Sequence, residues 1–233
     1  MKCSIIEVTD RINLELVNHR VSLSQEDTAV VESVWQEAVN EGKFNGTILG
    51  YLGHTVSSEG LITITSYVEE YKYFLAQVRH PELGFLVQPI GVSAATVDAS
   101  GTYLIGRRGK HVTQYPNNLE FVPSGGISPN NTGGKDLHLR EIIKEFEEET
   151  RFASREINSV DTFGLVYNPE HGVYDIEFRI LLGRDLRKER NLRKEHQSEE
   201  KVKREDLGNF ISNNIVIPSM HTIYQLLKEH GKI

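Results

Sequence analysis

Five glutamates fall within one short stretch of the chain, residues 136–152, which reads DLHLREIIKEFEEETRF. Four of them are spaced three or four residues apart, and they are Glu141, Glu145, Glu148 and Glu149. Their spacings of three and four residues place them on one face of a helix, where neighbouring carboxylates repel one another. A hard cation such as Mg²⁺, which takes oxygen ligands, would offset that repulsion. The alternative is an exposed acidic helix in which Arg140 and Lys144 are the partners, and the periodicity alone favours this alternative.

The sequence pattern predicts the helix that carries these glutamates and the strand and turn that precede it. Leu139, Ile142, Ile143 and Phe146 recur at the spacing of one apolar helix stripe. The segment 121–126 reads FVPSGG, a predicted strand that ends in a Gly-Gly turn. Glycines at such a turn let the backbone come close to a phosphate or a metal ion. The helix and the turn together therefore favour a phosphate or metal site.

This stretch resembles the Nudix box, G-x5-E-x7-R-E-U-x-E-E-x-G-U, in which U is apolar. The second half of the box aligns with residues 144–152, KEFEEETRF. The three glutamates that the family uses on metal are in register, and they are Glu145, Glu148 and Glu149. The resemblance covers the box and not the whole chain.

The sequence also departs from the box at several positions. Lys144 replaces the family arginine, and Arg151 replaces the late glycine. Gly126 lies four residues further upstream than the pattern allows, so the segment SPNNTGGK reads as an insertion. Asp136 has the spacing of the early glutamate. The supporting residues are thus altered, whereas the metal ligands are kept.

The resemblance implies a metal-dependent hydrolase, a diphosphatase acting on phosphoanhydride bonds through attack by water. The implied cofactor is Mg²⁺ or Mn²⁺. The implied metal ligands are Gly126, Glu145, Glu148, Glu149 and Glu200, and the catalytic residues are the first three of these glutamates. The general base differs between family members, so Glu148, Glu149 and a loop residue such as Glu200 all stay open. Lys144 should brace the acidic cluster as a point charge, without the planar fork of an arginine.

Four further residues are candidates for substrate binding. Arg107 and Arg108 end a predicted strand, and two guanidinium groups there can clamp a diphosphate. The alternative is an exposed basic turn. Tyr115 can stack on a base or sugar, although such a tyrosine is more often simply half-buried. Tyr174 lies beside a turn and can face the same pocket, but a packing role is the commoner one.

The mixed-charge run 184–206 is ambiguous. Its default interpretation is an exposed helix or an ordered insertion with surface ion pairs. Many Nudix enzymes place an additional glutamate on a loop after the last core strand. Glu199 and Glu200 are the residues of this run that such a loop would present.

The composition excludes several classes of protein. The chain has 233 residues, a formal net charge of −7 and Cys3 as its only cysteine. An acidic chain is not expected to carry an extended nucleic-acid surface, although a local basic pocket remains compatible with this charge. A single cysteine permits no intrachain disulfide and no cysteine-based zinc site. We expect no signal peptide and no transmembrane span, and therefore a cytoplasmic protein.

The chain order predicts two parts, an N-terminal α+β region at 1–84 and a Nudix hydrolase domain at 85–233. The first part has a helix after Ser24 and a hairpin formed by 47–56 and 61–68. The second has strands before and after the acidic helix and a last helix from Pro218. The resemblance implies an α/β/α sandwich with a mixed sheet for this second part.

The substrate is expected to be a nucleoside diphosphate linked to another group X. An F-N-G segment at 44–46 and a Tyr-rich segment after it are similar to those of Nudix hydrolases that act on nucleotide sugars, so a nucleotide sugar, such as a UDP-sugar, is favoured. A capped RNA or a dinucleotide polyphosphate fits the same box. An isopentenyl diphosphate isomerase of the same superfamily is disfavoured. Such isomerases use an active-site cysteine, and Cys3 lies outside the predicted Nudix hydrolase domain.

Two other classes of function stay open. One is a catalytically inactive Nudix-fold nucleotide sensor or interaction protein, for which Arg151 and the interrupted loop argue. The other is a structural α/β protein with an accidental acidic helix. A homodimer formed through the N-terminal region is an expectation by analogy alone.

Overall fold

The computed structural model describes residues 2–129, 136–193 and 196–233. Its strands are β1 (Ser4–Val8), β2 (Ile12–Leu16), β3 (Thr47–Val56), β4 (Ile62–Glu70), β5 (Ile90–Val97), β6 (Thr102–Arg107), β7 (Leu119–Phe121), β8 (Ser124–Gly126), β9 (Ile157–Asn168), β10 (Val173–Leu182) and β11 (Ser198–Lys203). Its helices are α1 (Gln25–Asn40), α2 (Tyr71–Arg79), α3 (Leu137–Glu149), α4 (Leu207–Asn213) and α5 (Pro218–Glu229), with short 3₁₀ turns η1 (Ser154–Glu156) and η2 (Arg204–Asp206).

A large mixed sheet forms the centre of the molecule, in the order β1-β9-β10-β5-β6-β11. Strand β5 pairs in parallel with β10 along its whole length. It pairs with β6 only at Val97 and Tyr103, after which the two strands separate. Strand β8 then pairs with β5, and β7 pairs with β6. The sheet is therefore split at the end where the Gly-Gly turn lies.

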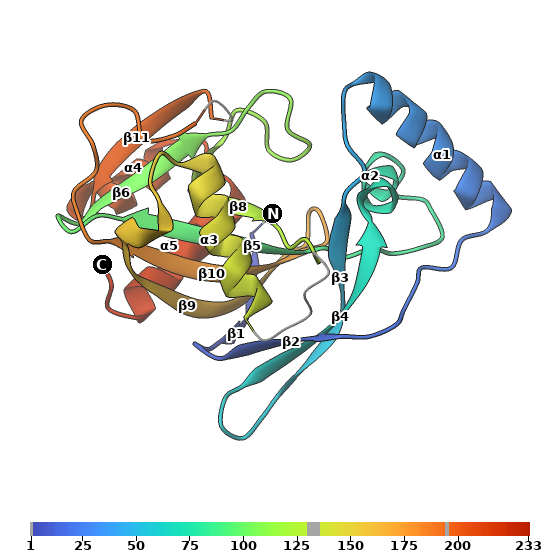
Figure 1. Cartoon of the computed structure of the whole chain (residues 1–233), viewed down its shortest axis with the longest axis horizontal. Helices are drawn as coiled ribbons and strands as arrows, with labels where there is room; N and C mark the ends of the chain where they lie inside the picture. The colour runs from blue at the N-terminus through green and yellow to red at the C-terminus, as the bar shows by residue number, and fades with distance from the viewer. Residues whose placement is uncertain (1, 130–135, 194–195) are drawn as a thin grey trace.

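Helices cover both faces of this sheet, with α3 on one side and α4 and α5 on the other (Figure 1). Ile142 and Phe146 of α3 are fully buried against β5 and β10. The predicted face of the last helix is buried on the opposite side, through Met220, Ile223, Leu226 and Leu227. Each such side chain contributes about 1.5–3 kcal/mol by leaving water. The predicted α/β sandwich with a mixed sheet is confirmed.

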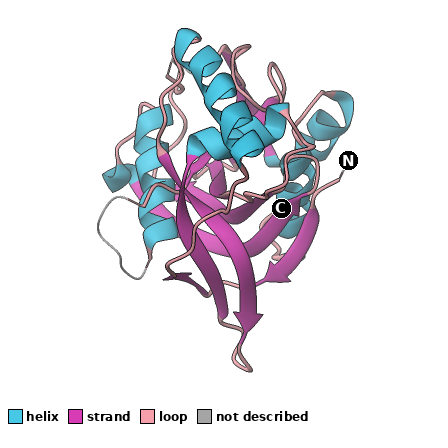
Figure 2. Cartoon of the chain, turned by 90° about the vertical axis from the view of Figure 1, so that its right-hand side faces the viewer, coloured by secondary structure: helices cyan, strands magenta, loops and turns pink. Residues whose placement is uncertain are grey.

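The N-terminal region carries a second, smaller sheet in the order β2-β4-β3. Figure 2 shows this region nearest the viewer, with the long β3–β4 hairpin pointing downwards. Helix α1 begins after Ser24, whose Oγ accepts a hydrogen bond from the backbone N–H of Asp27 at 2.9 Å. Helix α2 follows β4 directly.

The two sheets are connected at several points. Strand β1 pairs with β9, so the first residues of the chain belong to the large sheet. Leu49, Ile62 and Ile64 of the small sheet share a core with α3. Gly50 also forms a bridge with Pro89, just before β5. A domain boundary at residue 84 therefore stays a prediction, and β1 lies on the far side of it.

The described residues of the mixed-charge run 184–206 form a loop, the edge strand β11 and the 3₁₀ turn η2, rather than an α-helix. The backbone N–H groups of Asn191 and Leu192 donate to the Glu199 carboxylate, which holds the loop against the strand. Most of the predicted insertion SPNNTGGK lies outside the described residues. In the part of the chain that the structure describes, no helix is long and apolar enough to span a membrane.

Candidate functional site

A cavity of about 640 Å³ opens at the split between β5 and β6. Its walls come from β5, β7, β8, the end of α3, the segment 108–115 and the N-terminal region. The sequence-predicted site residues that line it are Arg108, Tyr115, Gly126 and Glu149. The split of the sheet thus brings the Gly-Gly turn and the acidic helix to one hollow.

Glu120 on β7 is at the centre of the charged end of this cavity. It forms an ion pair with Arg108 and accepts a hydrogen bond from Ser124 Oγ at 3.2 Å. His196 Nε2 lies 3.3 Å from Glu120 Oε1. Burial raises the pKa of Glu120, but the hydrogen bond from His196 and the charge of Arg108 outweigh that effect and leave the pKa below its ordinary value. The carboxylate is therefore held ionised.

Two glutamates of α3 contact the backbone of β8. The N–H of Ser124 donates to Glu149 Oε1 at 3.4 Å. The Glu145 carboxyl carbon lies 2.4 Å from an ideal Cβ on Gly125, so a side chain at that position would displace the Glu145 carboxylate. Burial raises the pKa of Glu145 to about 7, although the Lys144 charge opposes this rise.

Lys144 braces the acidic face of α3, as the sequence predicts. Its Nζ lies 2.7 Å from Glu141 Oε1, 3.7 Å from Glu145 Oε1 and 3.8 Å from Glu148 Oε1. Glu148 is exposed and does not line the cavity. The three glutamates of the box thus stand in different surroundings, and only Glu145 and Glu149 converge on the turn.

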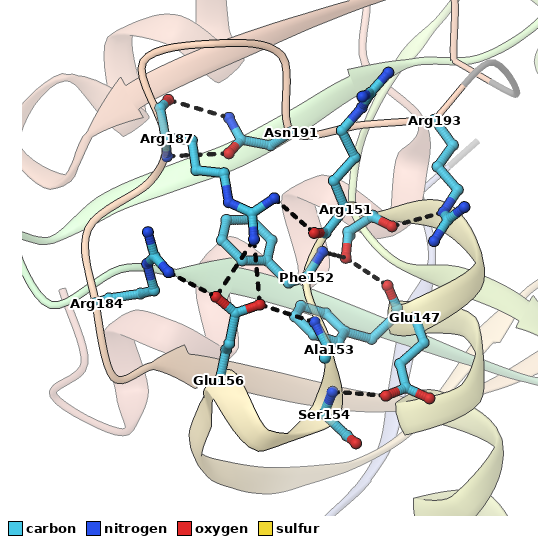
Figure 3. Close-up of polar contacts among 12 residues, drawn as sticks. Glu147, Arg151, Phe152, Ala153, Ser154, Glu156, Arg184, Arg187, Asn191 and Arg193 are labelled. Carbon is cyan, nitrogen blue, oxygen red and sulfur yellow. Dashed lines mark hydrogen bonds and ion pairs between the residues drawn. The ribbon is translucent and has the colours of Figure 1, made fainter.

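A loop fastened to the end of α3 positions His196. The N–H of Arg193 donates to the Glu149 carbonyl at 2.8 Å, and the N–H of Arg151 donates to the Asn191 carbonyl at 2.8 Å. Arg187 donates to the Arg151 carbonyl at 2.7 Å (Figure 3). These bonds hold residues 187–193 in place, and the N–H of His196 donates to the Arg193 carbonyl at 3.4 Å.

Arg151 shows why the late glycine of the box is dispensable here. The described non-glycine residues with positive φ are Tyr115, Asn117 and Asp136, so the backbone at Arg151 needs no glycine. The contacts drawn for Arg151 in Figure 3 are made by its backbone. This departure is therefore compatible with an intact end of α3.

The predicted substrate-binding residues divide into two pairs. Arg108 and Tyr115 line the cavity. The Tyr115 hydroxyl donates to Glu170 Oε2 at 3.1 Å, and burial raises its pKa. Arg107 instead donates to the Asn117 carbonyl at 2.8 Å, outside the cavity lining. Tyr174 stacks on Tyr51 at 3.7 Å between ring centroids, which is the packing role.

Two further sequence candidates lie away from the cavity. Glu200 is exposed on β11, paired with Ile105, and does not line the cavity. Asp136 is exposed at the start of α3 with a left-handed backbone, at φ 71°. A role for either at the charged end would require a movement of its side chain toward that end.

Glu120, His196 and Asp175 are site residues that sequence reasoning missed. Asp175 lines the cavity, and the absence of a side chain on Gly91 leaves room for its carboxylate. Burial raises the pKa of Asp175 to about 6, although the Arg108 charge opposes this rise. The alternation of charged and apolar residues along 174–179 was a signal for Asp175. No pattern singles out His196 within its charged run.

The same face of β10 carries a buried carboxyl group, Glu177. Its side chain is 0% exposed, and neither carboxyl oxygen has a hydrogen-bond partner among the described residues. Burial raises the pKa of Glu177 well above its ordinary value, and the nearby Asp175 charge adds to this rise. Glu177 is therefore held in its neutral form.

No family model matches the sequence, and no curated protein matches it in sequence. Among solved structures, MutT from Methanosarcina mazei Go1 is similar with 17% identity and a TM-score of 0.42, covering 62% of this chain and 95% of that one. A bifunctional NMN adenylyltransferase/ADP ribose pyrophosphatase from Francisella tularensis has 14% identity and a TM-score of 0.49, covering 69% and 47%. The NUDIX domain of NrtR from Shewanella oneidensis has 10% identity and a TM-score of 0.48, covering 63% and 90%. At these values, the assignment of a function rests on the residues of the site.

Proposed function

We propose that this protein is a Nudix hydrolase that cleaves the diphosphate of a nucleoside diphosphate linked to another group X. The observation that carries the proposal is the position of Glu145 and Glu149. Both are in register with the Nudix box, and both contact the Ser124-Gly125 backbone beside the cavity. An accidental acidic helix would have no reason to direct two carboxylates at a glycine turn.

The donor chemistry of this end suits a divalent cation. Glu145 and Glu149 offer carboxylate oxygens, and a Mg²⁺ or Mn²⁺ ion takes oxygen ligands. Within the described ranges, however, no three His, Cys, Asp or Glu side chains are grouped closely enough to hold a metal ion. The residues that would hold one are Glu145 and Glu149, with Glu148 brought in by rotation of its exposed side chain. When bound, the ion would neutralise diphosphate oxygens and make the phosphorus more electrophilic.

Side chains of the protein supply the other requirements of diphosphate hydrolysis, namely binding of the diphosphate and orientation of water. Arg108 lies at the cavity wall, where its guanidinium can bind diphosphate oxygens. Lys144 limits the repulsion among the α3 glutamates, so that the helix tolerates them. Glu149 is fixed at the wall by Ser124 and can orient a water molecule toward the diphosphate.

For the substrate, we propose a nucleotide sugar. Support comes from the size of the cavity, about 640 Å³, which falls in the range of small-molecule sites. A cytoplasmic location and a homodimer formed through the N-terminal region stay predictions. The second candidate function is a non-catalytic nucleotide sensor, which the exposed position of Glu148 favours.

The test is phosphorus NMR of nucleotide sugars, dinucleotide polyphosphates and nucleoside triphosphates incubated with the protein and Mg²⁺ or Mn²⁺. We expect metal-dependent cleavage of a nucleotide sugar, reduced at least 100-fold in Glu149→Gln. Glu147→Gln is the matched control, because Glu147 lies on the same helix but is exposed and accepts from the Ser154 N–H. If no compound is cleaved while nucleotides raise the melting temperature, the protein is a sensor.

A further inference from the structure

The two ends of the cavity differ in chemistry. One end carries the charged cluster around Glu120. The other end is formed by the N-terminal region, which contributes the aromatic rings of Phe44, Tyr71 and Phe74 and the aliphatic Ile48. A ligand that fills the cavity therefore needs a charged part at one end and an apolar part at the other.

Phe44 is the unusual member of the apolar end. Its side chain is 86% exposed, the highest value among the exposed large hydrophobic residues. Ile215 and Leu86, at 75% and 62%, are also exposed, but they do not line the cavity. An aromatic ring left in water at the mouth of a cavity is a surface that a ligand can cover.

The backbone that carries Phe44 is fixed by three hydrogen bonds to the β4–α2 junction. Asn45 Nδ2 donates to Glu70 Oε2 at 2.6 Å, and Asn45 Oδ1 accepts from the Lys72 N–H at 3.0 Å. The Gly46 carbonyl accepts from the Tyr71 N–H at 2.9 Å. The backbone next to Phe44 is thus anchored by Asn45 and Gly46, and such anchoring lowers the entropy lost when a ligand stacks on the ring.

The apolar wall is also bonded to the segment that carries Arg108. The Tyr71 hydroxyl lies 3.0 Å from Thr113 Oγ1, and Lys43 Nζ lies 3.5 Å from the same oxygen. Thr113 is five residues beyond Arg108 in the chain. The aromatic end and the charged end therefore belong to one continuous site rather than to two separate surfaces.

We propose that Phe44 is the stacking platform for the base of a nucleotide ligand, with the diphosphate directed toward Arg108. This inference rests on the proposed function for the identity of the ligand as a nucleoside diphosphate derivative. A nucleobase has a flat π-face, and such a face stacks on an aromatic side chain whatever the base. The N-terminal region would then bind the nucleoside, and the split sheet would bind the diphosphate.

The test is calorimetric titration of UDP, ADP and inorganic pyrophosphate into the full-length protein. We expect Phe44→Ala to weaken UDP and ADP binding about tenfold or more, since stacking of one base contributes that much affinity. Pyrophosphate has no base, and its affinity should be unchanged. Phe44→Trp should keep the nucleotide affinity. Binding of UDP, but not of pyrophosphate, should change the fluorescence of the tryptophan that this variant introduces.

Leu86→Ala is the control, because Leu86 is exposed but lies outside the cavity lining. Equal UDP affinity in Phe44→Ala and wild type would overturn the proposal, as would the absence of any nucleotide binding to the wild type. A base-dependent loss of binding in a protein that cleaves nothing would support the stacking site and contradict the hydrolase instead. Since Phe44 is exposed, neither variant should alter folding, and equal melting temperatures would verify this.

Discussion

The carboxylates of Glu120, Glu145 and Glu149, on β7 and α3, differ in their surroundings from the carboxyl group of Glu177 on β10. Glu120, Glu145 and Glu149 lie beside cations or backbone N–H groups. Glu177 lies beside neither, since its oxygens have no hydrogen-bond partner among the residues described. Cations or backbone N–H groups offset the charge of the first group, whereas Glu177 is held neutral. Burial alone therefore does not identify a functional carboxylate. The cations and N–H donors beside it determine whether it is charged.

Removal of Glu120 should have the largest effect on stability. Glu120→Ala leaves the Arg108 guanidinium and the His196 ring without their carboxylate. Loss of one partner of a buried ion pair costs about 3–5 kcal/mol, and the slight exposure of Arg108 places the expected loss near the lower limit, about 3 kcal/mol. Urea unfolding followed by circular dichroism measures it. Glu205→Ala, at an exposed position, should change stability by less than about 0.5 kcal/mol. If Glu120→Ala changed the free energy of unfolding as little as Glu205→Ala, the partners of Glu120 would not distinguish it from Glu177.

Glu177→Gln should stabilise the protein, in the direction opposite to Glu120→Ala. The folded state raises the pKa of Glu177 above its ordinary value of 4.5, so its contribution is fully present below pH 4.5 and is lost as the pH rises toward the folded-state pKa. An amide does not ionise and avoids this loss. We expect Glu177→Gln to gain about 1–2 kcal/mol at pH 8 relative to pH 4.5, within the cost of leaving a buried polar group unpaired. A pH-independent difference in unfolding free energy would contradict a neutral, buried Glu177.

Lys144→Met should have a smaller effect, because Lys144 is 41% exposed. Its charge offsets the repulsion among the α3 glutamates, but solvent screens the contribution to about 0.5–1 kcal/mol. The loss should shrink in 0.5 M salt, where these repulsions are screened. Thermal melts at low and high salt measure both quantities. An identical loss at the two salt concentrations would indicate that packing of the lysine stem, and not its charge, matters.

Arg151→Ala should have the smallest effect, within about 0.5 kcal/mol, because its contacts in Figure 3 are made by the backbone. Arg187→Ala is the informative partner. Arg187 donates to the Arg151 carbonyl, pairs with Glu156 and lies 4.6 Å from the Phe152 ring centre. Its removal should cost about 1–2 kcal/mol. If chemical unfolding showed Arg151→Ala to be the more destabilising variant, the Arg151 side chain would itself stabilise the fold, which contradicts this expectation.

The sequence predicted those features that depend on local periodicity. The stripe of Ile142 and Phe146 identified the buried face of α3, because an amphipathic helix repeats its pattern every 3.6 residues. The capping by Ser24 and the last helix from Pro218 were predicted by short-range signals of the same kind. The place of Lys144 beside three glutamates followed from helix geometry.

The charged end of the site was not predictable in this way. Glu120 lies in a three-residue strand, which is too short to show a period. Its partners Arg108 and His196 are 12 and 76 residues away along the chain. The loop before His196 is held partly by backbone bonds to the end of α3, which any side-chain sequence could make, and partly by the side chains of Arg187 and Glu199, which form no recognisable sequence pattern. Contacts of this range depend on the topology of the split sheet.

In the proposed reaction, water attacks phosphorus of a diphosphate at the charged end of the cavity. The most direct measurement is cleavage of a nucleotide sugar in ¹⁸O-labelled water with Mg²⁺ or Mn²⁺, followed by mass spectrometry of the products. We expect one ¹⁸O atom on a phosphate group of the products, and the loss of this signal in Glu149→Gln. Label found only on the sugar carbon, or no cleavage by the wild type, would contradict it.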